Sequence, residues 1–151
     1  MTCGSLFSGI GGFDLAAKWM GWETKWFVEN DKFCKKILEK RFPNVPIYGD
    51  IEQIDFRKVE PVDIVFGGFP CQPFSTAGKQ KGKNDNRYLW PEMLRAIRET
   101  RQAWIIGENV AGIINLALEQ VCAGLEAEGY EVQPFIIPAC AVNAQHRRDR
   151  V

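Results

Sequence analysis

Short apolar runs alternate with longer amphipathic segments along this chain, and this alternation constrains the fold more than any other feature. In the first half, three apolar runs and two helical patterns follow one another at residues 5–7, 12–20, 24–28, 32–41 and 62–66. In the second half, amphipathic or helical stretches again alternate with apolar runs, at residues 89–100, 103–106, 113–128 and 132–137. Such alternation is typical of βαβ units. The sequence therefore predicts an α/β fold with a doubly wound, mostly parallel sheet.

Length and composition exclude several classes of protein. The 151 residues suit one domain, and the 19 Lys and Arg against 19 Asp and Glu give no global positive field that would indicate a nucleic-acid partner. The odd number of cysteines without a CxxC pair argues against a disulfide framework or a zinc knuckle. No apolar run approaches the roughly 20 residues of a membrane span, and residues 1–12 do not suit a signal peptide. We expect a soluble cytoplasmic protein in a reducing compartment.

A glycine-rich turn lies where the first predicted strand passes into the first predicted helix. Its sequence, Phe7-Ser8-Gly9-Ile10-Gly11-Gly12-Phe13, allows close approach of a ligand, although such a turn also suits a plain tight connection. Glu29 ends the second strand about 20 residues later, where a carboxylate can accept hydrogen bonds from ribose hydroxyls. Asp50-Ile51 ends the third, and each acid alone also suits a cap or turn. Together these features predict an adenosine-containing ligand.

Cys71 lies in an unusual loop after the apolar strand at residues 63–66. The loop reads Gly67-Gly68-Phe69-Pro70-Cys71-Gln72-Pro73-Phe74-Ser75, at a strand's carboxyl end, where open α/β sheets bind ligands. A free thiol with a pKa of about 8.5 needs nearby positive charge, a helix end or a base to act as a nucleophile. The alternative is a small buried apolar residue. Two flanking prolines and a diglycine argue against that alternative.

This loop resembles the Pro-Cys loop of the cytosine-C5 DNA methyltransferases. The other motifs follow in that family's order: the turn at residues 7–13, Glu29, Asp50-Ile51, Glu108-Asn109-Val110 and the arginine-rich residues 145–151. The resemblance covers essentially the whole chain. It implies a sheet of the S-adenosylmethionine-dependent methyltransferase (Rossmann-like) type, with residues 1–151 as one catalytic domain.

The resemblance also implies S-adenosyl-L-methionine as cofactor and no metal. The residues expected at the cofactor are Phe7, Ser8, Gly9, Ile10, Gly11, Gly12, Glu29, Asn30, Asp50, Ile51 and Pro70. Asn30 stands where many relatives carry an aromatic residue that packs on adenine.

Four residues are expected to act on the cytosine. By resemblance, Cys71 adds to C6 as the nucleophile and Glu108 holds the N3 edge. In residues 145–151 two registers are open. Counting from Gln145 leaves Asp149 where the second arginine belongs, whereas counting back from Arg150-Val151 pairs Arg148 with Arg150. We prefer the second register, in which Arg150 reaches the cytosine O2 and Arg148 supports the site.

Double-stranded DNA is the implied substrate, with its target base flipped out of the helix. Residues 72–87 show no periodicity, which predicts a long loop. By resemblance, this loop closes over the site. The DNA contacts expected there are Gln72, Ser75, Lys79, Lys81 and Arg87. A solvated charge run is the alternative for the lysines.

The family normally continues with further strands, a target-recognition domain and a last cofactor motif. We therefore expect the sheet to lack its last strands and to expose an edge. The chain is then a fragment, one subunit of a split enzyme whose second chain carries target recognition, or a decayed copy. Two other functions stay open: an inactive cofactor- or partner-binding module, and a tRNA cytosine-C5 methyltransferase. The expected setting is a prokaryotic or phage-like restriction-modification system, with the protein at the nucleoid through its DNA.

Overall fold

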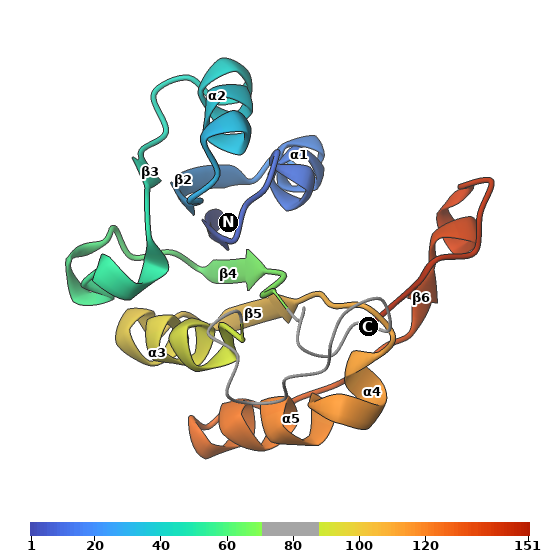
Figure 1. The fold of residues 1–151 in the computed structure, drawn as a ribbon. Helices are drawn as coiled ribbons and strands as arrows, with labels where there is room; N and C mark the ends of the chain where they lie inside the picture. The colour runs from blue at the N-terminus through green and yellow to red at the C-terminus, as the bar shows by residue number, and fades with distance from the viewer. Residues whose placement is uncertain (71–87) are drawn as a thin grey trace. The chain divides into compact units, whose positions relative to one another are not determined.

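The computed structural model describes residues 1–70 and 88–151 of the protein (Figure 1). The chain divides into two compact units. Unit 1 consists of Met1–Gly68 and Arg95–Gly107, and unit 2 of Phe69–Leu94 and Glu108–Val151. Unit 1 holds a five-stranded sheet, whereas unit 2 holds a small two-stranded sheet. Within the described ranges, no helix is long and apolar enough to cross a membrane.

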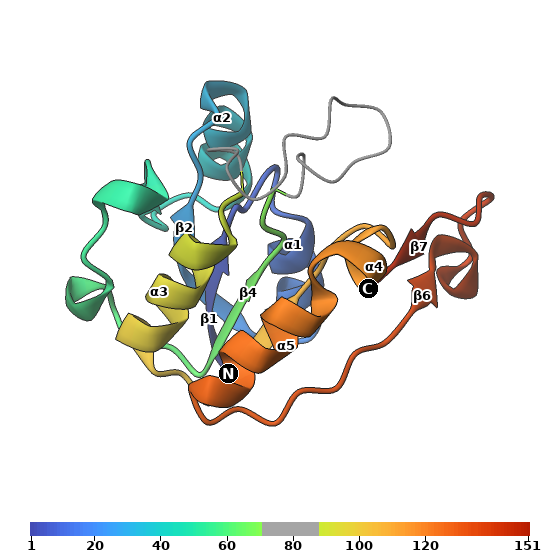
Figure 2. The same cartoon turned by 60° about the horizontal axis from the view of Figure 1, so that its bottom comes forward.

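The sheet of unit 1 is parallel and doubly wound, as predicted. Its strands are β1 (Thr2–Leu6), β2 (Glu23–Val28), β3 (Ile47–Tyr48), β4 (Ile64–Gly67) and β5 (Trp104–Gly107). They lie in the order β3-β2-β1-β4-β5, and each pairing is parallel. Strands β1, β2 and β4 are seen side by side in Figure 2. The strand order reverses direction at β1 and β4, where such sheets bind their ligands at the carboxyl edge.

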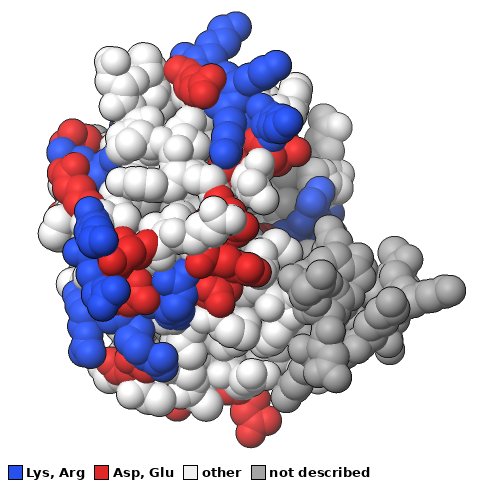
Figure 3. All heavy atoms as spheres, turned by 60° about the vertical axis from the view of Figure 1, so that its left-hand side comes forward, with Lys and Arg blue, Asp and Glu red and all other residues white. Residues whose placement is uncertain are grey.

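The helices begin and end close to their predicted residues. Helix α2 (Lys32–Arg41) has the predicted bounds, and α1 (Gly12–Trp19) and α3 (Trp90–Thr100) each differ by one residue at one end. Asp31 caps α2 by accepting hydrogen bonds from two backbone amides of the first turn. Figure 3 shows basic side chains gathered over α2, which carries Lys32, Lys35, Lys36, Lys40 and Arg41.

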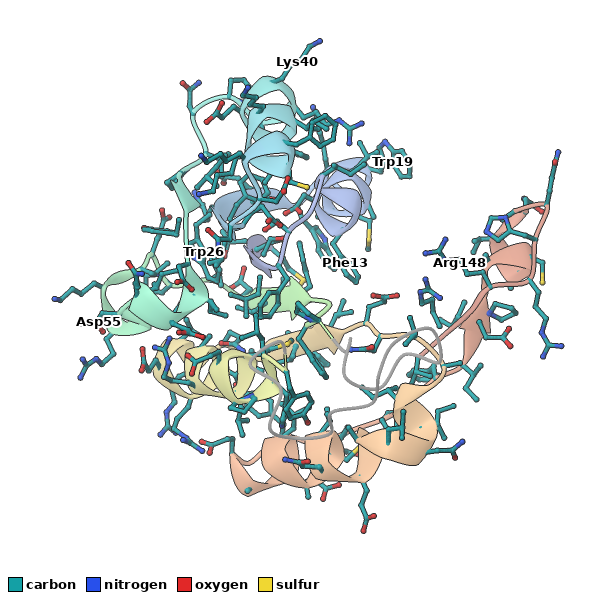
Figure 4. The ribbon with its side chains drawn as sticks, in the orientation of Figure 1. Phe13, Trp19, Trp26, Lys40, Asp55 and Arg148 are labelled. Atoms are coloured by element: carbon teal, nitrogen blue, oxygen red, sulfur yellow. The ribbon has the colours of Figure 1, made fainter. Side chains whose placement is uncertain are left out.

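One face of the sheet packs against α1. Cys3, Ile64 and Phe66 are buried there with Ala17 of α1, and the Phe13 ring stacks on Phe66 at 5.3 Å (Figure 4). These alternate strand positions share one face because successive side chains of a strand point to opposite sides.

The opposite face is covered by other elements. Gly4 leaves room for the Trp26 ring, which would lie 2.1 Å from a Cβ atom at that position. Trp26 packs on Phe56 at 6.2 Å, and the Arg95 guanidinium of α3 lies over the Phe56 ring. Unit 1 therefore has cover on both faces, as a doubly wound sheet requires.

Strand β5 is an edge of the sheet and keeps apolar side chains exposed. Trp104 pairs with Ile64 and Ile106 with Phe66, so all four side chains belong to the face that α1 covers over β4. Ile64 and Phe66 are buried, whereas Trp104 is 64% and Ile106 42% exposed. In the part of the chain that the structure describes, β5 is the last strand at this edge of the sheet.

Unit 2 corrects two predictions from the sequence. The helix expected at residues 113–128 is divided into α4 (Ile113–Leu116) and α5 (Leu118–Ala127), because Ala117 between them has a φ of −153°, outside helical geometry. The strand expected at residues 132–137 is wrong, since only β6 (Ile137–Pro138) forms, antiparallel to β7 (Asp149–Arg150). Pro134 has no N–H for a ladder, and Phe135 and Ile136 are exposed.

Candidate functional site

The turn after β1 has three residues in the left-handed region of backbone space. The φ angles are 52° at Phe7, 54° at Gly9 and 84° at Gly11. The turn is closed by a hydrogen bond from the Gly11 amide to the Ser8 carbonyl at 2.9 Å, and the Ser8 amide donates to the Val28 carbonyl at 3.1 Å. The turn is therefore fixed to the end of β2.

The glycines of this turn have different roles. A Cβ atom on Gly11 would lie 2.9 Å from the Phe42 ring and 3.0 Å from Leu38, so this glycine allows α2 to pack under the turn. A Cβ atom on Gly9 or Gly12 would meet no atom within 4 Å. Gly9 thus has a backbone conformation that favours glycine, and the space that a Cβ atom would occupy there is open. A ligand can therefore approach the backbone at Gly9.

Glu29 lies directly beside the turn. One carboxylate oxygen accepts the Gly9 amide at 2.7 Å, and the other accepts the Asp31 amide at 2.7 Å. A carboxylate oxygen can accept more than one hydrogen bond, so the Glu29 carboxylate can also accept hydrogen bonds from two neighbouring hydroxyl groups of a ligand. Asn30, the next residue, is exposed. The predicted turn and acid are thus brought together, and they fit the ribose of an adenosine-containing ligand.

Asp50 and Ile51 follow β3 after one glycine. The Asp50 carboxylate accepts the Glu52 amide at 3.1 Å and caps a short 3-10 helix, which is the alternative role that the sequence left open for it. Ile51 is buried, and its carbonyl accepts a hydrogen bond from Arg95 at 2.7 Å. Two members of the predicted cofactor group therefore also have structural roles of their own.

In unit 2, the predicted catalytic residues Glu108 and Arg150 form an ion pair. Arg150 Nε lies 2.5 Å from a Glu108 carboxylate oxygen, with the side chains 27% and 38% exposed. The two segments are joined at the backbone, because the Asn109 amide donates to the Val151 carbonyl at 2.8 Å and the Val151 amide donates back at 3.0 Å. Val110 and Arg150 form a β-bridge beside these bonds.

Asn109 also fastens the stem of the cysteine loop. The side-chain Nδ2 of Asn109 donates to the Phe69 carbonyl at 3.1 Å, and its side-chain Oδ1 accepts the Val110 amide. Phe69 is buried against the rings of Tyr88 and Trp90, at 6.2 and 5.3 Å. Phe69 and Pro70 are the last residues described before Cys71. Unit 2 therefore holds this stem against the segment that carries Glu108.

Arg148 takes a different position from Arg150. It is exposed and has a left-handed φ of 37° (Figure 4), and its carbonyl accepts the Ala139 amide at 3.2 Å. The neighbouring Arg147 pairs with Asp149 at 3.2 Å. Among the catalytic residues predicted from the sequence, the described structure therefore joins Glu108 and Arg150 by a direct contact.

Comparison with known proteins identifies the family. Residues 1–151 match the family model of the C-5 cytosine-specific DNA methylases. The chain belongs to this family. It is 34% identical to the type II methyltransferase M.NgoFVII of Neisseria gonorrhoeae, in an alignment that covers 97% of this chain and 41% of that protein. It is 33% identical to the type II methyltransferase M.HhaI of Haemophilus parahaemolyticus, over 97% of this chain and 46% of that protein. It is 42% identical to M.AquIA of Picosynechococcus over 74% of this chain and 49% of that protein.

Solved structures agree with the fold. A DNA modification methyltransferase encoded within an Escherichia coli prophage superposes with a TM-score of 0.81 at 26% identity, over 99% of this chain and 44% of that one. The Schizosaccharomyces pombe Dnmt2 methyltransferase gives 0.80 at 20% identity, which supports the fold alone. This C5 methylase chain therefore spans about half the length, or less, of the relatives that it matches.

Several predicted residues of this methylase lie outside the described part of the chain. They are the nucleophile Cys71 and the DNA contacts Gln72, Ser75, Lys79, Lys81 and Arg87. Among the described residues, Cys3, Cys34, Cys122 and Cys140 are free, and burial raises the pKa of the Cys3 thiol to about 11. No cluster of three or more metal-ligating side chains occurs within residues 1–70 and 88–151.

The sequence analysis missed two residues that support the methylase site, and it named a third, Asn109, in the Glu108-Asn109-Val110 motif without its role. Arg41 donates to the Ile10 carbonyl of the turn at 2.9 Å. Asp14 is buried in the first turn of α1 and accepts hydrogen bonds from the Ser5 and Thr24 hydroxyls. Asn109 fastens the Phe69 stem. Of the two missed residues, Asp14 left a signal, as an acid flanked by apolar residues where helix α1 meets the sheet.

Proposed function

We propose that residues 1–151 form the catalytic, S-adenosyl-L-methionine-binding domain of a DNA (cytosine-5-)-methyltransferase. The observation that carries this proposal is the Glu108–Arg150 ion pair, which Asn109 joins to the stem of the Cys71 loop. Membership of the C-5 cytosine-specific family supports it. Addition to a cytosine ring requires a carboxylate, a guanidinium and a thiol. Glu108 and Arg150 supply the first two, and Cys71, two residues after Phe69, supplies the thiol.

The residues of the glycine turn fit the proposed cofactor. When bound, S-adenosyl-L-methionine supplies an electrophilic methyl group. Glu29 would accept hydrogen bonds from the ribose hydroxyls, and the open side of Gly9 would allow the ligand to approach the backbone. We assign Phe7, Ser8, Ile10, Gly11 and Gly12 to the same turn, with Asn30, Asp50, Ile51 and Pro70 as further cofactor contacts.

The chain's own residues would act on the cytosine in sequence. The Cys71 thiolate forms a bond to C6 of the flipped base, and the electron pair of the C5–C6 double bond becomes available at C5. Glu108 holds the N3 edge and favours the N3-protonated ring, which accepts sulfur addition. Arg150 hydrogen-bonds O2 and withdraws charge from the ring as sulfur adds. After C5 has gained the methyl group it loses its proton to a base, the S–C6 bond breaks, and Cys71 leaves as the thiolate.

The ion pair supports one of the two registers for the arginine motif. Arg150, counted as the second arginine, contacts Glu108 at 2.5 Å. Arg148 would then be the supporting arginine on the exposed side. In the other register the second arginine position falls on Asp149, which pairs with Arg147 instead. An acidic residue there would not stabilise the charge that develops on O2.

We further propose that double-stranded DNA is the substrate, contacted by Gln72, Ser75, Lys79, Lys81 and Arg87, and that a second polypeptide carries target recognition. The exposed apolar side chains of Trp104 and Ile106 on the edge strand β5 suit such a partner. The named relatives are bacterial type II methyltransferases, which supports a cytoplasmic site of action near the nucleoid. The chain alone is expected to methylate DNA weakly.

A covalent trap tests the proposal. The chain is incubated for hours with S-adenosyl-L-methionine and a duplex carrying 5-fluorocytosine in many sequence contexts, and complexes are separated on a denaturing gel. Fluorine at C5 cannot leave as a proton does, so even a slow reaction accumulates an adduct. We expect an adduct that Cys71→Ser abolishes and that Cys140→Ser, which changes an exposed cysteine, retains.

Other outcomes separate the alternatives. Cofactor binding without any adduct would favour a catalytically inactive binding module. An adduct with 5-fluorocytosine tRNA and none with the duplex would favour a tRNA methyltransferase. An adduct that persists in Cys71→Ser would contradict the proposed nucleophile.

A further inference from the structure

Three lysines form a row along the outer side of α2. Lys32, Lys36 and Lys40 are exposed and are spaced four residues apart, so they lie one above another on the helix surface. The opposite side of α2 carries Leu38, which is buried beneath Gly11 of the glycine turn. Lys40 extends away from the helix (Figure 4). We call these three residues the lysine row.

The charges of the lysine row are not neutralised by their neighbours. Helix α2 holds five cations and one acid, Glu39, in a chain whose cations and acids are equal in number. The Asp31 carboxylate, next to the row in sequence, accepts two backbone amides as the cap of α2. Within residues 1–70 and 88–151, no ion pair includes a member of the row. The row is therefore a local concentration of positive charge, visible over α2 in Figure 3.

This arrangement works against the stability of the helix. Like charges four residues apart repel each other along a helix, and the row contains two such pairs. Lys32 also places a cation in the first turn, where the helix dipole favours an acid. Helix α2 thus carries an electrostatic cost that an anion bound along the row would remove.

The phosphate backbone of duplex DNA is an anion of suitable geometry. Positions four residues apart on a helix are separated by about 6 Å along its axis, and each DNA strand carries a phosphate every ~3.4 Å of duplex axis. Evenly spaced charge can therefore meet all three lysines, whereas an acidic protein would need carboxylates at a matching spacing. The row is also presented on a fixed element, because α2 is capped by Asp31 and packs through Leu38.

We propose that the lysine row binds the phosphate backbone of duplex DNA independently of its sequence. This inference rests on the proposed function, which makes double-stranded DNA the substrate. Helix α2 begins at the carboxyl end of β2, the edge at which such sheets bind their ligands. Phosphate contacts supply affinity and rapid association but carry no sequence information. The row would hold the chain on DNA through contacts other than those proposed for residues 72–87.

The salt dependence of DNA binding tests the inference. Fluorescence anisotropy gives the Kd for a labelled duplex of A·T pairs only, which contains no cytosine, between about 50 and 200 mM salt. Each lost phosphate contact lowers the slope of log K against log salt by about 0.9. We expect the triple variant Lys32→Gln, Lys36→Gln, Lys40→Gln to lower this slope by about 2 to 3 and to raise the Kd at least roughly tenfold.

A second triple variant removes the same charge elsewhere in unit 1. Lys18→Gln, Arg57→Gln, Lys58→Gln changes three exposed cations, of which Arg57 and Lys58 pair with Asp55. It should change the slope by less than about 1. Urea denaturation gives a further readout, because the row variant loses two repulsive pairs and gains glutamines of similar helix propensity. It should unfold at the same or a higher urea concentration than the wild type.

The possible failures are distinguishable. Equal slopes for wild type and row variant, or equal losses in the two triple variants, would overturn the inference. A loss of affinity for an RNA duplex without any loss for DNA would also overturn it. The 5-fluorocytosine trap tests the proposed function separately: an adduct together with an unchanged slope would refute the lysine row alone, whereas neither adduct nor DNA binding would contradict both.

Discussion

Asp14 is a buried carboxyl group whose charge works against folding. Its side chain is 1% exposed and accepts hydrogen bonds from Ser5 at 3.0 Å and Thr24 at 3.1 Å. Burial raises the pKa of Asp14 from 3.8 to about 6, although the two hydroxyl groups favour the charged form. Between these pH values the folded protein holds a proton that the unfolded chain has lost. This group therefore makes the protein less stable as pH rises from about 4 to about 6.

Replacement of Asp14 by asparagine should remove that pH dependence. A shift from 3.8 to about 6 corresponds to roughly 3 kcal/mol. We compare the free energy of unfolding of Asp14→Asn with that of the wild type. This difference should shift in favour of Asp14→Asn by up to about 3 kcal/mol between pH 4 and pH 7. Urea denaturation across this range measures it.

Asp63 provides a control of opposite sign. Hydrogen bonds from the backbone amide and the hydroxyl of Thr2 lower the pKa of the Asp63 carboxyl, so its stabilisation is present at neutral pH and is lost on acidification. Asp63→Asn should therefore destabilise the protein more at pH 7 than at low pH.

Parallel stability profiles for wild type and Asp14→Asn would contradict the assignment for Asp14.

At the scale of elements, the turn between β1 and α1 depends on the packing of α2 beneath it. We expect Gly11→Ala to destabilise the protein by roughly 2–4 kcal/mol, from a φ of 84° that disfavours alanine and from overlap with Phe42 and Leu38. Gly12→Ala is the matched variant, because Gly12 begins α1 and its Cβ would meet no atom within 4 Å. It should be neutral or stabilising by up to about 1 kcal/mol.

Thermal and chemical unfolding of the two variants compares these effects directly. Equal stability of Gly11→Ala and Gly12→Ala would show that α2 does not restrict the turn as the structure indicates.

At the scale of the molecule, β5 forms an edge of the sheet among the described residues. Trp104 is 64% exposed on this edge strand, and unpaired apolar edges favour association with other chains. We expect Trp104→Lys to reduce concentration-dependent association in light scattering, with the free energy of unfolding changed by no more than about 0.5 kcal/mol. Trp19→Lys, at an exposed helix end, should leave association unchanged.

A large loss of stability in Trp104→Lys would instead mean that this side chain belongs to the core. Equal effects of Trp104→Lys and Trp19→Lys on association would remove the special role of the sheet edge.

Features that depend on near neighbours in the chain could be predicted from the amino-acid sequence. Residue periodicity predicted α2 to its terminal residues and the parallel sheet. The glycine turn and Glu29 were predicted to serve one ligand, and the Gly9 amide indeed donates to Glu29 at 2.7 Å. Local patterns failed at residues 132–137, because a strand also requires a partner strand, which an apolar run cannot supply. The break at Ala117 likewise left no signal in the periodicity.

Contacts between residues far apart in the sequence became visible with the folded structure. The ion pair between Glu108 and Arg150 and the bond from Asn109 to Phe69 join segments about 40 residues apart. The hydroxyl groups that Asp14 accepts hydrogen bonds from, on Ser5 and Thr24, come from two different strands. The spacing of apolar side chains indicates whether a segment is a helix or a strand. It does not indicate which segments lie next to one another in the folded protein. That arrangement is set by the packing of the whole sheet, which no local pattern contains.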